Sequence, residues 1–82
     1  MVKVIFYNLI RSKYRIEDLE VEAGSLQEVI KQVIKKHPHI DKDDLLQAVL
    51  FINQEKVMHV NRLDEKVEDG DHVVFTNFVG GG

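Results

Sequence analysis

The residues of this sequence that could do chemistry for another protein are the last five, Phe78 to Gly82, which end in three consecutive glycines. Glycine has no Cβ atom, so such a segment is thin and can adopt backbone angles that are closed to other residues. Its last group is the α-carboxylate of Gly82, which the segment could present inside the narrow active site of a second protein. The alternative is a frayed terminus without a function, which is common in proteins.

Other side chains offer weaker candidates for chemistry. The chain has no cysteine, which excludes disulfides, thiolate metal sites and a cysteine nucleophile of its own. The aspartates between residues 41 and 44 lack the spacing of an EF-hand calcium loop, so we expect a solvated loop there. No close carboxylate–histidine motif accompanies the histidines, and we expect no metal site. The histidines are His37, His39, His59 and His72.

Length and composition limit the classes of function. A chain of 82 residues allows one small domain. Its formal net charge of −3 argues against a nucleic-acid partner bound mainly through phosphates. No apolar run approaches the length of a membrane span, and the amino terminus lacks the layout of a signal peptide. We therefore expect a cytoplasmic protein.

Two strands are predicted in the first part of the chain. Val2 to Leu9 is rich in β-branched and aromatic residues, and both alternating sets of side chains are largely apolar. This pattern is typical of a central strand that is covered on one face and partly covered on the other. Ile10 to Tyr14 is predicted to be a polar turn. Arg15 to Glu22 alternates more cleanly, with Leu19 and Val21 inward, and the short connection favours an antiparallel hairpin.

One long helix is predicted after Gly24. Ser25 and Glu28 have the spacing of a capping box, in which each side chain accepts a hydrogen bond from the other residue's backbone amide. Apolar residues then recur at helical spacing and form one stripe for the core. The helix is expected to end before Pro38. The stripe consists of Leu26, Val29, Ile30, Val33 and Ile34.

The second half of the chain predicts a short helical turn and three strands. Asp41 is positioned to cap a turn that reaches Gln47. Glu68 to Asp71 is predicted to be a tight turn, in which Gly70 supplies the positive φ angle. Leu63 and Val67 are expected to anchor an irregular segment into the core. The predicted strands are Ala48 to Asn53, Lys56 to Val60 and His72 to Asn77.

These elements predict an α+β fold in two layers. The first and last strands are the most apolar, so we place them side by side at the centre of a mixed sheet of about five strands. The one main helix is expected to pack on one face of this sheet. Residues 1–77 are expected to form a single domain, and residues 78–82 a flexible C-terminal tail that ends in Gly81-Gly82.

Three stretches of the chain resemble the ubiquitin-like β-grasp proteins, and more narrowly the family of the molybdopterin synthase small subunit and the thiazole-synthesis sulfur carrier. Val2 to Tyr7 resembles that family's first strand. Ala48 to Glu55 resembles its middle strand, where an asparagine leads into the turn. Leu63 to Gly82 resembles its ending, with an acidic-glycine turn before the last strand. The length, including the loop from Pro38 to Gln47, fits the molybdopterin branch better than the thiazole branch.

The resemblance implies a sulfur carrier for molybdenum cofactor biosynthesis that is not itself an enzyme. Its working group would be the carboxylate of Gly82, which a ubiquitin-activating-type enzyme adenylates with ATP. A sulfide equivalent then displaces AMP and leaves a thiocarboxylate. The implied partners are this adenylating enzyme and the large catalytic subunit of molybdopterin synthase. The carrier itself would bind no cofactor, and partner proteins would supply the catalysis.

The same resemblance implies that the tail and its root contact these partners. Gly81 and Gly82 would leave room in a narrow channel, and Gly80 would contact the partner with them. The five residues from Phe78 span about 16–18 Å when extended, enough to reach a buried site. Val79 and Phe78, together with Phe75 on the last strand, are predicted to form an apolar docking patch.

One departure from the family and three alternatives remain at this point. Asn77 and Phe78 stand where the family commonly has two prolines, which leaves the root of the tail less rigid. The first alternative is a carrier for thiazole synthesis. The second is a protein modifier whose tail forms an isopeptide bond to a lysine. The third is a β-grasp interaction module with an inert tail.

Overall fold

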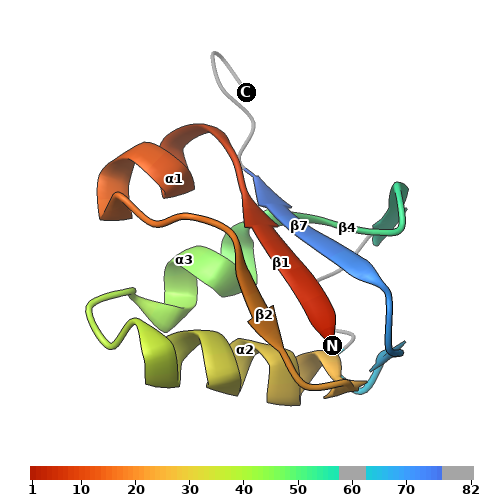
Figure 1. Cartoon of the computed structure of the whole chain (residues 1–82). Coiled ribbons are helices and arrows are strands. Elements are labelled where there is room, and N and C mark those ends of the chain that lie inside the picture. Colours follow the sequence, from red (N-terminus) through yellow and green to blue (C-terminus); the bar gives the residue numbers. More distant parts are fainter. Residues whose placement is uncertain (58–62, 77–82) are drawn as a thin grey trace.

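The computed structural model describes residues 1–57 and 63–76. These residues form a mixed five-stranded sheet, with the helices α2 (Leu26–Lys36) and α3 (Lys42–Gln47) on one of its faces (Figure 1). The strands are β1 (Val2–Phe6), β2 (Leu19–Val21), β3 (Gly24–Ser25), β4 (Val49–Ile52), β5 (Glu55–Val57), β6 (Lys66–Val67) and β7 (His72–Thr76). Their order in the main sheet is β2-β1-β7-β4-β5, while β3 and β6 pair separately. The predicted α+β fold is confirmed.

The first and last strands, β1 and β7, are parallel neighbours at the centre of the sheet, as predicted. Their register pairs Val4 with Val73 and Phe6 with Phe75, and all four side chains have no exposed surface. Because parallel strands run in the same direction, the chain enters both strands at one end and leaves both at the other. We call these two ends the amino end and the carboxyl end of the central pair.

The long helix α2 begins and packs as the sequence predicts. The Ser25 hydroxyl accepts from the Glu28 amide at 3.2 Å, and the Glu28 carboxylate accepts from the Ser25 amide at 3.0 Å, which completes the capping box. The first amides of a helix have no hydrogen-bond partner within the helix, so these side-chain hydrogen bonds stabilise the first turn. The buried residues of the helix are Leu26, Val29, Ile30 and Val33.

The prediction of a polar turn after the first strand is wrong. Residues Asn8–Tyr14 form a helix, α1, and the following strand is shorter than predicted, since β2 contains only Leu19–Val21. Ile10 is buried and Tyr14 packs against the same core, so tertiary contacts stabilise a helix that is too short to be stable alone. Arg15, with φ +53°, ends α1 in the left-handed region. The antiparallel pairing of β1 with β2 is nevertheless confirmed.

Most local predictions in the second half of the chain are confirmed. Asp41 caps α3 by accepting a hydrogen bond from the Asp43 amide. The expectation of a solvated loop at residues 41–44 is wrong, because Asp43 and Asp44 lie in this helix and Asp44 is bonded to α1. Val67 is buried and Leu63 packs against the core. Gly70 lies in the predicted tight turn with φ +88°. The parts of the predicted strands at residues 58–60 and 77 lie outside the described residues.

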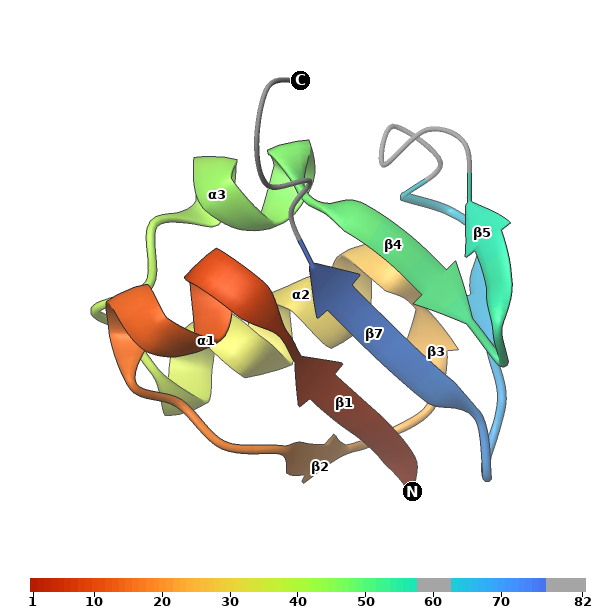
Figure 2. The same ribbon diagram turned by 90° about the horizontal axis from the view of Figure 1, so that it is seen from above.

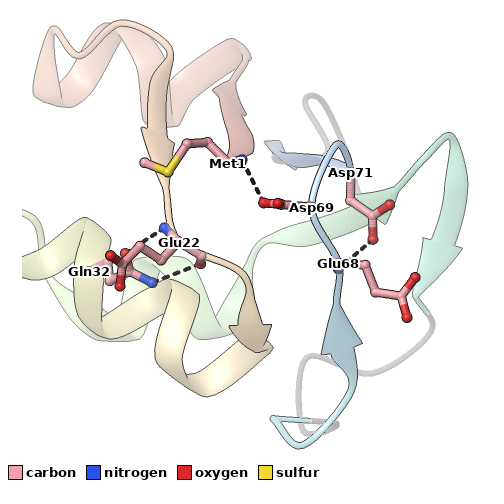
Figure 3. A network of polar contacts seen from close by, with 6 residues as sticks. All are labelled: Met1, Glu22, Gln32, Glu68, Asp69 and Asp71. Atoms are coloured by element: carbon pink, nitrogen blue, oxygen red, sulfur yellow. Dashed lines mark hydrogen bonds and ion pairs between the residues drawn. The ribbon is translucent and has the colours of Figure 1, made fainter.

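Polar side chains of α2 bond the backbone of the edge strand β2. The Gln32 carboxamide accepts from the Glu22 amide at 2.7 Å and donates to the Glu22 carbonyl at 3.0 Å (Figure 3). Lys36 Nζ donates to the Glu20 carbonyl at 2.8 Å. These hydrogen bonds fix the long helix against the edge of the sheet in addition to its apolar contacts.

A second polar network joins α1 to α3. The Asp44 carboxylate accepts hydrogen bonds from Lys13 Nζ at 2.8 Å and from the Tyr14 hydroxyl. The Asp41 amide donates to the same Tyr14 hydroxyl at 3.2 Å. The hydrogen bonds from Lys13 and then Tyr14 hold the pKa of the Asp44 carboxyl below its ordinary value. This network fixes the position of α1.

We predict that acid weakens this attachment of α1. The folded state lowers the pKa of Asp44, so its stabilisation is complete above the unfolded-state pKa of about 4 and is lost as the pH falls through the lower folded-state pKa. Urea unfolding from pH 7 into the acid range should therefore show a steeper loss of the free energy of unfolding for the wild type than for Asp44→Asn. The exposed neighbour Asp43→Asn serves as the control and should follow the wild type. Equal slopes for the wild type and Asp44→Asn would contradict the prediction.

Candidate functional site

The candidate functional site lies at the carboxyl end of the central pair, where the tail begins. Strand β7 ends at Thr76, after which the chain leaves the described residues. The predicted roles of the tail residues, and the predicted domain boundary at residue 77, therefore stay predictions. The predicted site residues outside the described part are Phe78, Val79, Gly80, Gly81 and Gly82. The structure does place Thr76, the root of the tail, and its neighbours.

The root of the tail is held by the corner between β1 and α1. Asn8 Nδ2 donates to Thr76 Oγ1 at 2.5 Å, and the Tyr7 amide donates to the Phe75 carbonyl at 3.0 Å. Asn8 has φ +60°, a left-handed conformation that asparagine tolerates better than most residues. This conformation turns the chain from the strand into the helix. Two hydrogen bonds thus connect the exit of the first strand to the exit of the last.

The prediction that Phe75 belongs to an exposed docking patch is wrong. Its side chain has no exposed surface and stacks on Phe6, with ring centroids 5.8 Å apart and planes inclined by 16°. The alternation of side chains along β7 explains the error, because Val73 and Phe75 face the helices while Val74 and Thr76 face the other side. Phe75 is a core residue that positions the strand before the tail.

Figure 2 looks onto the sheet face that α2 does not cover. Apolar side chains on this face lie next to the root of the tail. Ile5, Phe51 and Val74 are partly buried, and Tyr7 is 49% exposed. They line a shallow groove of about 560 Å³ that includes Thr76. We call these five residues the open face. Contiguous apolar surface of this kind is typical of protein–protein contacts.

The site prediction from the sequence did not include Tyr7, Phe51 or Thr76. The signal was present in the first strand, where the second set of alternating side chains includes Ile5 and Tyr7 and is also largely apolar. Two apolar faces on one strand predict that both are covered, and in this chain only the helix-facing set is buried. The second apolar set of the first strand therefore indicates the partly exposed open face, whereas Phe75 is buried in the core.

The polar groups at the far end of the groove serve the fold. Asn53 and Gln54 form the predicted turn between β4 and β5, with φ of +50° and +71°. Asn53 Nδ2 donates to Asp71 Oδ1 at 2.8 Å, and the His72 amide donates to Asn53 Oδ1 at 2.9 Å. Hydrogen bonds from Asn53 and from the Glu68 amide lower the pKa of the Asp71 carboxyl. These side chains hold the turn against the start of β7.

The described residues show no grouping of three or more histidine, cysteine or carboxylate side chains that could hold a metal ion. In the same residues, no helix has the length and apolar character that a membrane crossing requires. What the described residues present at the carboxyl end is a shallow, partly apolar groove beside Thr76, the last described residue of β7.

The fold and the site define the class of protein. A mixed sheet with a central parallel pair, crossed by one main helix and followed by a tail at the carboxyl end, is the ubiquitin-like β-grasp architecture. The sequence matches the ThiS family over residues 4–82, so the chain belongs to this family of ubiquitin-like sulfur carriers. No curated protein matches the chain.

Solved structures share the fold at low sequence identity. The small archaeal modifier protein 1 (SAMP1) of Methanosarcina acetivorans has a TM-score of 0.78 at 19% identity, over 99% of this chain and 95% of that one. A chain of the Amycolatopsis orientalis BexX/CysO complex has a TM-score of 0.76 at 22% identity, over all of both chains. A chain from the complex of subunits 1 and 2 of the Helicobacter pylori molybdopterin-converting factor has a TM-score of 0.66 at 19% identity, over 99% and 97%.

We predict that Phe75 is required for folding. Phe75→Ala removes a fully buried ring and should lower the free energy of unfolding by about 3–5 kcal/mol. Tyr7→Ala, which removes a half-exposed ring from the open face, should cost about 1 kcal/mol or less. Urea unfolding followed by circular dichroism measures both values. A cost below about 1 kcal/mol for Phe75→Ala would contradict its place in the core.

Proposed function

We propose that the chain is a sulfur carrier that works as the small subunit of a molybdopterin-synthase-type assembly in molybdenum cofactor biosynthesis. The observation that carries this proposal is the family match, which extends from the first strand through Gly82 and so includes the glycine tail. The position of the tail root supports it, because β7 ends at Thr76, which belongs to the open face. In this proposal the domain holds the tail and partner proteins supply the catalysis.

The proposed chemistry takes place at the carboxylate of Gly82. This carboxylate attacks the α-phosphate of ATP in the activating enzyme, and the products are an acyl adenylate and pyrophosphate. A sulfide equivalent then attacks the acyl carbon, the bond to the AMP oxygen breaks, and AMP leaves. The result is a thiocarboxylate that carries one nucleophilic sulfur. A carrier of this kind needs no cysteine, which agrees with the composition of the chain.

The choice of the molybdopterin branch rests on the middle of the chain. Between α2 and β4 the chain includes the short capped helix α3, whose Leu45 is buried in the core. Residues 38–47 are the insertion whose length distinguishes the longer molybdopterin branch in the resemblance described above. The Helicobacter pylori relative is named as subunit 1 and 2 of a molybdopterin-converting factor, which supports a large catalytic subunit as the second partner of this chain.

We predict that the chain gains sulfur at its end. Incubation with a ubiquitin-activating-type enzyme, ATP and a sulfide donor should raise the intact mass by the difference between one sulfur and one oxygen atom. A chain that lacks Gly81-Gly82 should keep its mass under the same conditions. Fragmentation of the modified chain should locate the sulfur at Gly82. No change with several activating enzymes that load other carriers would count against the proposal.

A protein modifier is the second candidate, because a neighbour of high structural similarity is named a small archaeal modifier protein. A modifier would form an isopeptide bond between Gly82 and a lysine of a target. Expression of a tagged chain in its own cells should then give conjugates of higher mass, and deletion of Gly81-Gly82 should remove them. For the sulfur carrier proposed above, we expect no such ladder in a blot of the cell extract. A ladder that depends on these glycines would show a modifier function.

A further inference from the structure

The exposed side of α1 is basic in an acidic chain. Residues 8–15 contain Arg11, Lys13 and Arg15 and no carboxylate. Since the whole chain has a net charge of −3, the residues outside this segment carry −6. Ile10 and Tyr14 occupy the core side of the helix. The side chains of Arg11 and Lys13 are 49% and 61% exposed, so these cations face the solvent.

Arg11 and Arg15 are the cations of α1 that are available to an external anionic group. Lys13 is bonded to Asp44 at 2.8 Å as part of the network that fixes the helix. Arg11 lies 3.9 Å from Asp18, and both side chains are largely exposed, an arrangement that contributes little to stability and is easily exchanged. Arg11 and Arg15 line a shallow depression of about 390 Å³, which Glu17 also borders.

This basic surface lies beside the root of the tail. Helix α1 follows β1, so the parallel pair puts α1 and the carboxyl end of β7 at the same end of the sheet (Figure 1). The hydrogen bond from Asn8 to Thr76 joins the first residue of the helix to the last described residue of β7. A protein that takes the tail into a channel must therefore bring the mouth of that channel close to α1.

The opposite end of the central pair is acidic. The segment that leads into β7 carries five carboxylates and one cation, Lys66. Part of this segment lies at the start of β1, where the Met1 ammonium group is 2.6 Å from the Asp69 carboxylate and neutralises one charge (Figure 3). The carboxylates are Asp64, Glu65, Glu68, Asp69 and Asp71. Carboxylates also lie near α1, where Asp44 bonds Lys13 and Asp18 lies 3.9 Å from Arg11, so the contrast is between the exposed arginines of α1 and the acidic segment at the amino end.

We propose that the exposed side of α1, centred on Arg11 and Arg15, is a docking surface for an acidic protein surface beside the channel that receives the tail. Guanidinium groups pair with carboxylates through two parallel hydrogen bonds, which adds orientation to attraction. An acidic partner surface attracts the exposed arginines of α1 and repels the acidic segment at the amino end. Electrostatic steering by such charges raises association rates by about 10- to 1,000-fold. The identity of the partner rests on the proposed function, whereas the surface itself does not.

A titration with an acidic peptide tests the surface without any partner. A hexaglutamate peptide added to the isotope-labelled chain should shift the backbone amide resonances of residues 8–16, and about 0.5 M salt should abolish the shifts. The double variant Arg11→Gln, Arg15→Gln should lose them. A matched variant, Lys31→Gln and Lys35→Gln on α2, removes the same charge from another helix and should keep them. Shifts centred on α2, or shifts that survive loss of both arginines, would overturn the proposal.

Association kinetics test the docking role with an activating enzyme that loads the wild-type chain. At low ionic strength, the arginine double variant should bind about tenfold more slowly than the wild type, while the matched lysine variant stays within about twofold. The yield of thiocarboxylate at saturating enzyme should be unchanged, because the tail is intact. Equal association rates for the two variants would refute docking through α1. If no activating enzyme converts the wild-type chain to a thiocarboxylate, this would count against the proposed function. The peptide titration would still test whether the surface of α1 binds an acidic group.

Discussion

The parallel pairing of β1 with β7 is the constraint on which the arrangement of the molecule depends. Parallel neighbours must be joined by a crossover, and here the chain between them supplies α2, which covers the paired strands on one face. The stacked rings of Phe6 and Phe75 lie at the centre of the resulting core. The same pairing puts α1 and the tail at one end and the acidic turn at the other. The register of these two strands thus determines which described elements lie at each end of the sheet.

The groups with shifted pKa values in this domain take part in hydrogen bonds and ion pairs that stabilise the fold. In the described residues, each group with a shifted pKa favours its charged form: the carboxyls of Glu28, Asp44 and Asp71 are lowered, and the amines of Met1 and Lys13 are raised. Catalytic acids and bases commonly show the opposite, because burial disfavours the charge. The shifted groups of the described residues are therefore surface charges that hydrogen bonds and ion pairs stabilise.

The sequence predicted correctly those features that depend on interactions between residues close together in the chain. The capping box of Ser25 and Glu28, the cap at Asp41 and the positive φ of Gly70 each depend on neighbours within a few residues. Helix α1 could not be predicted in the same way, because one apolar pair, Ile10 and Tyr14, gives no periodic pattern and its anchor at Asp44 lies 30 residues from Tyr14. The alternation of side chains along β7 determines that Phe75 points into the core. The prediction of an exposed Phe75 was based on its closeness to the tail in the sequence, which does not determine the side of the sheet that it faces.

The edge strand β2 has a consequence for how molecules of this kind coexist at high concentration. Open strand edges recruit strands from other copies, which leads to aggregation or swapped dimers. Here the outward amide and carbonyl of Glu22 and the carbonyl of Glu20 already bond to Gln32 and Lys36 of the same molecule. A strand from another copy could not form hydrogen bonds to these backbone groups, because Gln32 and Lys36 already bond them. The long helix therefore protects this edge of the sheet from pairing with strands of other copies, which favours a chain that stays monomeric at high concentration.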